Sequence, residues 1–133
     1  MVLDDVKQYL PTDKCDYDSI DRLKSLKPEE LQRIIPELLE WIQDINWPVA
    51  PKIIEILIPL DKLLLPQLRV ILRCNEYDWI ENCLWYLVRR LNSDTLLELR
   101  NELVMLSKST NPNFIEYEIP QICKEIMSTH SME

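Results

Sequence analysis

Apolar residues recur three and four positions apart along most of the chain, a spacing that places them on one face of an α-helix. No alternating pattern bounded by glycine-containing turns marks a strand, and the sequence contains no glycine. The clearest stretch predicts a helix over residues 28–43, because Pro28 suits a first helical turn. The predicted inner face of this helix consists of Leu31, Ile34, Ile35, Leu38 and Ile42. The pattern therefore predicts an all-α fold.

The apolar pattern repeats after 30 residues without a gap, so that the segment from Ile34 aligns with the segment from Leu64. This register also pairs Pro36 with Pro66. Each unit would then consist of a first helix that contains a proline, a short turn and a second helix. Because a proline inside a helix removes one backbone hydrogen bond, a kink is expected at the same place in both first helices.

The stretch PELLEWIQDINWPVAPKIIEIL, residues 36–57, combines a proline, paired leucines, a short acidic turn and a second apolar helix. This order resembles the HEAT repeat family, and the D-x-N-W-P-V-A turn is similar to that of a small, uncharacterised bacterial family of HEAT-like proteins. The resemblance is closest over residues 28–91. It implies a right-handed α-α superhelix (a solenoid) of about six or seven helices in antiparallel pairs, and it implies no activity.

A chain of 133 residues is expected to form one domain. Its expected parts, in chain order, are an N-terminal capping segment (1–27), a first repeat (28–60), a second repeat (61–92), a third, divergent repeat (93–128) and a tail (129–133). In the capping segment and the third repeat, the residues expected to face the core are Ile20, Leu23, Leu26, Leu99, Leu103, Ile119, Ile122 and Ile126. The third repeat is divergent because the stretch SKSTNPN lengthens its loop.

The turn of the first repeat is assigned a structural role. Without a glycine to end the first helix in a left-handed residue, the chain is expected to stop at Asp44 and Asn46 and to restart at Pro48 or Pro51. Asp44 and Asn46 are expected to accept hydrogen bonds from the free N–H groups at the head of the next helix. Trp47 would fill the gap between the paired helices.

The second helix of the second repeat, residues 78–91, carries the best candidate for a partner-binding surface. Its predicted core side consists of Ile80, Cys83, Leu84, Leu87, Val88 and Leu91. The predicted opposite flank consists of Asp78, Asn82, Trp85 and Arg89, and Lys52 and Glu55 of the first repeat would extend it. A tryptophan beside an arginine is typical of interface hot spots. The alternative is that Trp85 and Trp79 fill gaps between neighbouring helix pairs.

Candidate chemistry is sparse. The sequence contains no catalytic motif, no zinc-ligand spacing and no phosphate-binding glycine loop, and its single histidine, His130, lies in the C-terminal tail. Asp78 and Glu81 could share a proton as an acid–base pair, but the same spacing serves a solvated helix face. We therefore predict no catalytic residue, no metal site and no cofactor. Of the four cysteines, Cys83 and Cys123 fall on apolar helix faces and are expected to be buried free thiols.

Charge narrows the choice of partner and compartment. Fifteen Lys and Arg against 23 Asp and Glu give a net charge of −8, which opposes binding to nucleic acid or to anionic membranes and favours a basic protein partner. The N-terminal stretch MVLDDVKQYLPTDKCD lacks the features of an export signal. Charges and a proline interrupt the apolar residues 53–65, so this stretch is not expected to span a membrane. A cytoplasmic protein is predicted.

The sequence thus favours a protein-binding module without catalytic activity, such as an immunity protein or an adaptor. One alternative is a DNA base-excision enzyme, an activity that HEAT-like folds can carry. Such an enzyme would need a basic channel, for which the available cations are Lys52, Arg69, Arg73, Arg89, Arg90 and Arg100. The other alternative is a homodimer in which the flank around Trp85 meets its own copy, so that both monomer and homodimer remain open.

Overall fold

The computed structural model describes residues 6–132, and within this range the regular structure is helical, with no strand. The prediction of an all-α fold is confirmed. The chain divides into two compact units, residues 1–64 and 65–133. Residues 1–5 of the predicted capping segment and residue 133 of the predicted tail lie outside the described residues.

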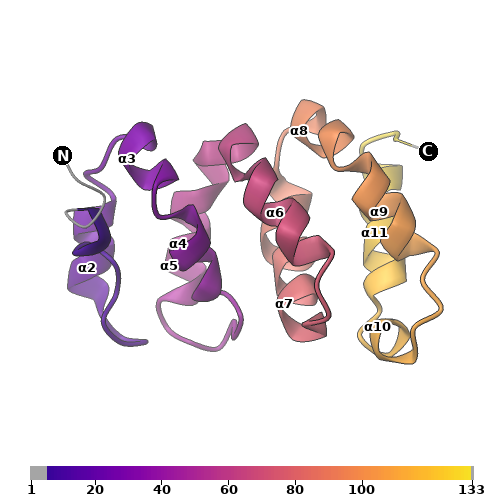
Figure 1. The fold of residues 1–133 in the computed structure, drawn as a ribbon, viewed down its shortest axis with the longest axis horizontal. Helices are drawn as coiled ribbons and strands as arrows, with labels where there is room; N and C mark the ends of the chain where they lie inside the picture. Colours follow the sequence, from indigo (N-terminus) through magenta and orange to yellow (C-terminus); the bar gives the residue numbers. More distant parts are fainter. Residues whose placement is uncertain (1–5, 133) are drawn as a thin grey trace. The chain divides into compact units, whose positions relative to one another are not determined.

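The first unit contains α2 (Tyr17–Leu23), α3 (Pro28–Gln32), α4 (Ile35–Glu40), α5 (Ala50–Leu57) and the 3₁₀ segment η1 (Ile58–Leu64). Figure 1 shows α4 running into a turn from which α5 returns, and α5 contacts both α2 and α4. In α2, the predicted core residues Ile20 and Leu23 are buried. Asp16 caps this helix, since its carboxylate accepts hydrogen bonds from the Ser19 hydroxyl at 2.6 Å and the Ser19 N–H at 3.1 Å.

The prediction of a single kinked helix over residues 28–43 is wrong, because the chain forms two helices there, α3 and α4. The break falls at Arg33 and Ile34, where Ile34 leaves helical geometry at φ −119° and ψ 14°. Pro36 explains the break, since it has no N–H to donate to the carbonyl of Gln32 and its ring crowds that carbonyl. The predicted inner face is nevertheless confirmed, because all five of its residues are buried.

Proline begins helices throughout the chain. Within residues 6–132, six of the α-helices hold a proline at their first or second residue, namely Pro28, Pro36, Pro51, Pro66, Pro112 and Pro120. Proline is favourable in a first turn, where its missing N–H costs no hydrogen bond, but it prevents the helix from extending further upstream. The many prolines of this glycine-free sequence therefore produce short helices with defined starts.

The turn between α4 and α5 is stabilised by its own residues rather than by capping of α5. The Asp44 carboxylate accepts a hydrogen bond from the Asn46 N–H at 2.9 Å, and the Asp44 carbonyl accepts one from the Trp47 N–H at 3.1 Å. The expectation that Asp44 and Asn46 cap α5 is wrong, since the N-cap residue Val49 has no side-chain cap. Asp44 lies too far upstream of Ala50 for its side chain to reach the first turn of α5.

Trp47 lies in this turn with its ring centroid 5.5 Å from that of Trp41, in an edge-to-face arrangement. Both tryptophans are half-buried, as is Pro48. The next residue, Val49, donates its N–H to the Lys14 carbonyl at 3.0 Å, which ties the turn to the segment before α2. The turn is thus anchored by an aromatic contact and a backbone hydrogen bond.

The second unit contains α6 (Leu65–Leu72), α7 (Tyr77–Asn82), the π-helical η2 (Cys83–Leu87), the 3₁₀ segment η3 (Val88–Arg90), α8 (Ser93–Glu98), α9 (Arg100–Ser107), α10 (Pro112–Glu116) and α11 (Ile119–Thr129). Helices α9 and α11 pack side by side, and α11 also contacts α7 and η2 (Figure 1). The core residues predicted for the third repeat, Leu99, Leu103, Ile119, Ile122 and Ile126, are all buried. The predicted loop SKSTNPN leads into α10, which begins at Pro112.

The predicted burial of Cys83 and Cys123 is confirmed. Burial raises the pKa of the Cys83 thiol far above its usual value and raises that of Cys123 to about 12, whereas Cys15 is exposed. Because the thiolate is the reactive form, brief treatment of the native protein with iodoacetamide at pH 8 is expected to label Cys15 and to leave Cys83 and Cys123 intact. Peptide mass spectrometry measures this, and the denatured protein, in which every cysteine should react, is the control. Labelling of Cys83 as fast as Cys15 would contradict the structure.

Candidate functional site

The second unit exposes two neighbouring aromatic side chains, Trp85 and Tyr86, on the π-helical segment η2. The π turn is defined by the Val88 N–H, which donates to the Cys83 carbonyl five residues earlier. Such turns are rare and frequently accompany functional sites. Trp85 is 42% exposed, a large apolar area to leave in water. This segment is therefore the first place to look for a binding surface.

Arg89 lies against Trp85, with its guanidinium carbon 4.2 Å from the indole centroid. At this distance the cation is attracted to the face of the ring. The predicted core side of the same helical stretch, from Ile80 to Leu91, is confirmed as buried. Trp85 and Arg89 are thus in contact on the exposed side, with Asp78 also exposed and Trp79 half-buried.

Asn82, predicted to share that exposed flank, is only 7% exposed, so this placement is wrong. The physical reason is that α7 packs against both α6 and α11, and two neighbours cover a wider arc than a one-sided amphipathic pattern indicates. Lys52 and Glu55 are exposed on α5, as predicted, but they belong to the first unit. There the Lys52 amine lies 5.3 Å from the centre of the Tyr17 ring.

A pocket of about 230 Å³ lies beside Trp85. Its walls come from α7, η2, the junction between α10 and α11, and α11 itself, all within the second unit. Its lining consists of Glu81, Trp85, Tyr86, Tyr117, Glu118 and Ile122, and we refer to it as the aromatic pocket. The contacts of α11 with α7 and η2 bring these residues together.

Negative charge gathers at the aromatic pocket. Burial, followed by the charges of Asp78 and Glu118, raises the pKa of Glu81. A hydrogen bond with Asp78, together with the charge of that carboxylate, raises the pKa of Tyr117. In the described part of the chain, no lysine or arginine forms an ion pair with Asp78, Glu81 or Glu118. The aromatic pocket therefore combines apolar walls with uncompensated carboxylates.

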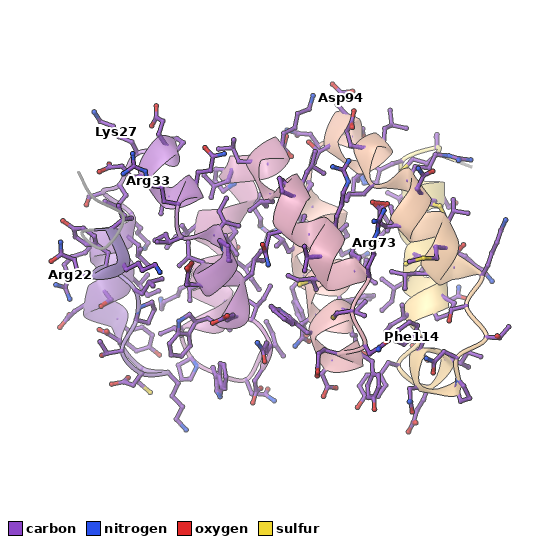
Figure 2. The ribbon with its side chains drawn as sticks, in the orientation of Figure 1. Arg22, Lys27, Arg33, Arg73, Asp94 and Phe114 are labelled. Carbon is purple, nitrogen blue, oxygen red and sulfur yellow. The ribbon has the colours of Figure 1, made fainter. Side chains whose placement is uncertain are left out.

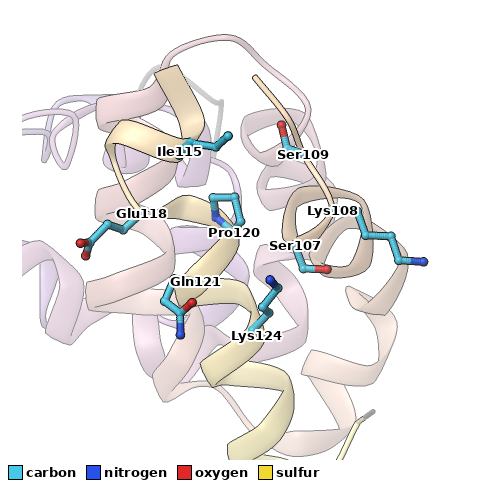
Figure 3. A pocket seen from close by; sticks show the side chains of 8 residues that line it. All are labelled: Ser107, Lys108, Ser109, Ile115, Glu118, Pro120, Gln121 and Lys124. Carbon is cyan, nitrogen blue, oxygen red and sulfur yellow. The ribbon is translucent and has the colours of Figure 1, made fainter. Parts of the chain in front are cut away.

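A second hollow, of about 820 Å³, lies between the end of α9 and the start of α11. Figure 3 shows the eight side chains that line it, with Lys108 and Glu118 pointing away to opposite sides. The Ser107 hydroxyl is already engaged, since it donates to the Val104 carbonyl at 2.7 Å. Lys108 and Glu118 thus do not converge on one point in this hollow, and the Ser107 hydroxyl is not available as a donor.

His130, predicted to lie in a C-terminal tail, has a hydrogen-bond partner in the structure. Its Nδ1 atom is hydrogen-bonded to the Ser93 hydroxyl at 2.9 Å, and the Arg100 Nε donates to the Met132 carbonyl at 3.2 Å. A serine–histidine contact is also part of hydrolase triads, but there the serine meets Nε2 and an acid orients Nδ1. The contact here uses Nδ1, so it joins the end of α11 to the start of α8 rather than forming a triad.

An ionic cluster between α6, α8 and α9 is also structural. Glu102 is 3% exposed, and its Oε1 lies 3.3 Å from the Arg69 Nε and 3.5 Å from an Arg73 terminal nitrogen. Figure 2 shows Arg73 in the space between α6 and α9. Of the cations that a nucleic-acid channel would need, Arg69 and Arg73 are thus paired with a carboxylate, and Arg89 is stacked on Trp85.

Residues 9–127 match the family described as Domain of unknown function (DUF5071). The chain belongs to the DUF5071 family. The DUF5071 match spans both units and includes every residue of the aromatic pocket. Comparison with curated proteins returned no match.

Within residues 6–132 of this DUF5071 protein, no group of three or more His, Cys, Asp or Glu side chains is placed to hold a metal ion. No helix in the same range is long and apolar enough to cross a membrane. The aromatic pocket and the Trp85–Arg89 pair are thus the features from which a function can be argued.

Proposed function

We propose that this DUF5071 protein is a protein-binding module without catalytic activity, and that it binds a basic protein through the surface around Trp85. The observation that carries the proposal is the exposed Trp85–Arg89 pair beside uncompensated carboxylates. Tryptophan and arginine dominate the binding energy of protein interfaces, and tryptophan is costly to leave exposed. The net charge of −8 favours encounter with a basic partner.

The proposal extends to the arrangement of the helices. We propose that they form HEAT-like repeats of a right-handed α-α superhelix whose concave surface contains the partner site. Two features support the repeat. Pro36 and Pro66, which the 30-residue register aligns, both stand at the second position of their helices, and the aligned Leu38 and Leu68 are both fully buried. A cytoplasmic immunity protein or adaptor, acting as a monomer or a homodimer, fits this description.

The proposal is tested by affinity purification from a lysate of the source organism, with the wild type and a Trp85→Ala, Arg89→Ala double variant as baits. We expect the double variant to lose one abundant co-purifying protein, because removing a hot-spot pair weakens an interface by about tenfold or more. The matched control is Val70→Ala, which removes another exposed apolar side chain from the same unit. Circular dichroism checks that all three proteins are equally helical.

Recovery of the same proteins by all three baits would contradict the proposal. Light scattering tests the homodimer alternative. A wild-type protein that is a dimer and a double variant that is a monomer would place self-association at Trp85. Binding of a duplex oligonucleotide with steep salt dependence would instead favour the DNA-processing alternative.

A further inference from the structure

We infer that the aromatic pocket receives the guanidinium group of an arginine side chain that a protein partner presents. The inference rests on the proposed function and deepens it, because it names the chemical group by which the partner is recognised. Three observations carry it: the aromatic walls, the uncompensated carboxylates and the strained backbone at Glu118.

The aromatic walls are held in place before any ligand arrives. Tyr117 lies with its ring centroid 5.1 Å from that of Tyr77, and it is hydrogen-bonded to Asp78. Tyr77 in turn meets Phe114 of α10 edge-on, with centroids 6.4 Å apart. Across the pocket, Trp85 and Tyr86 project from η2. A pocket with pre-ordered walls loses little conformational entropy on binding.

The size of the pocket indicates a single side chain. Its volume of about 230 Å³ lies below the range of roughly 300–1,000 Å³ that is usual for small-molecule sites. Its lining offers aromatic faces together with the carboxylates of Glu81 and Glu118. Aromatic faces attract cations, and carboxylates pair with them. The ligand is therefore a cation small enough to be one amino-acid side chain.

Arginine fits better than lysine because its guanidinium is planar. A planar cation can stack on an aromatic ring and at the same time donate two parallel hydrogen bonds to a carboxylate, whereas an ammonium group acts as a point charge. Trp85 already has one guanidinium, that of Arg89, over its ring at 4.2 Å. Arg89 is not part of the pocket lining, and within the described residues it forms no ion pair with Glu81 or Glu118.

The backbone at Glu118 supplies the third observation. This residue precedes α11 with φ 58° and ψ 24°, a left-handed conformation that is unfavourable for a residue with a Cβ atom. Its side chain makes no capping hydrogen bond to the helix. Glycine would adopt this conformation without strain, yet the position holds a carboxylate that lines the pocket and repels Glu81. Strain of this kind is commonly retained at binding sites.

The first test uses the tripeptide acetyl-Ala-Arg-Ala-amide as the probe, with versions that carry lysine or the neutral citrulline in place of arginine. Amide and indole NMR signals of the ¹⁵N-labelled protein are followed during titration. We expect the arginine peptide to shift the signals of Trp85, Tyr117 and Glu118 and to bind about tenfold tighter than the citrulline peptide. Equal binding of the citrulline or the lysine peptide, or shifts confined to residues outside the pocket, would overturn the inference.

The second test uses Glu118→Gly, which removes a pocket carboxylate and relieves the left-handed strain. We expect this variant to melt at a higher temperature than the wild type and to bind the arginine peptide about fivefold more weakly. Weaker binding by a more stable protein cannot be caused by misfolding. Glu125→Gln is the control, because it removes an exposed carboxylate of α11 outside the pocket and should leave binding unchanged. Full binding by Glu118→Gly, or equal loss in Glu125→Gln, would refute the assignment.

The inference and the proposed function can fail separately. If the Trp85→Ala, Arg89→Ala variant loses its protein partner while the arginine peptide shows no contact with the pocket, the protein-binding role stands and the arginine pocket is wrong. If the peptide binds in the pocket while every bait recovers the same proteins, the pocket stands and the proposed role of the Trp85 surface in partner binding is wrong.

Discussion

Replacing Leu103 by alanine is expected to lower the free energy of unfolding by about 3 kcal/mol. Leu103 is fully buried in α9, which packs along α11 in the core of the second unit. Alanine would remove most of this buried apolar side chain and leave a cavity, because the packed helices relax only in part. Equilibrium unfolding in urea, followed by circular dichroism, measures the loss.

Leu97→Ala is the matched control, since it is the same change on the neighbouring α8 at a side chain that is 54% exposed. Its expected cost is about 0.5 kcal/mol, within the range of ordinary surface substitutions. Equal costs for the two substitutions would mean that the α9–α11 contact is not the core of this unit.

Replacing Arg69 by alanine is expected to cost about 2 kcal/mol of stability. Arg69 joins three helices, because its Nε pairs with Glu102 of α9 and a terminal nitrogen donates to the Glu98 carbonyl at the end of α8, at 3.1 Å. Without it the buried carboxylate of Glu102 keeps only Arg73, and its Oε2 atom already has no hydrogen-bond partner among the described residues. The expected cost is smaller than for a fully buried pair because Arg69 is partly exposed to water.

Two further variants test whether the loss of stability comes from the buried charge of Glu102. Arg73→Ala is expected to cost less than Arg69→Ala, because Arg73 is the more exposed partner and makes the longer contact. Combining Arg69→Met with Glu102→Leu should recover most of the loss, since an apolar pair leaves no buried charge without a partner. If the combined variant is as unstable as Arg69→Ala in urea unfolding, the explanation by the unpaired carboxylate is wrong.

The two proposed binding features, the Trp85–Arg89 pair and the aromatic pocket, depend on different parts of the fold. Trp85 and Arg89 lie on one helical stretch and meet through local geometry, at helical spacing. The aromatic pocket instead needs the contacts of α11 with α7 and η2, and the left-handed residue Glu118 that sets the start of α11. We therefore expect changes that loosen α11 to affect arginine binding more than they affect the Trp85–Arg89 pair.

Much of the fold follows from the sequence alone, because helical periodicity is a local property. Apolar residues three and four apart must share one face of any helix they form, and this face needs a neighbour to cover it. The core side of the stretch from Ile80 to Leu91, the burial of Cys123 and the inner faces of α4 and α11 were predictable on this basis. So was the exposed position of Trp85, an aromatic residue on the polar side of an otherwise apolar helix.

Only the tertiary structure decided which polar residues those faces would cover and which distant residues would meet. Asn82 was predicted to lie on an exposed flank, but helices pack on more than one side, and Asn82, like Glu102, is buried by neighbours that its own segment does not reveal. Tyr117 and Glu118 carried no signal, since their place beside Trp85 depends on how α11 docks. Periodicity reports the direction in which a helix is apolar, whereas a binding pocket depends on long-range packing between helices, which no single segment encodes.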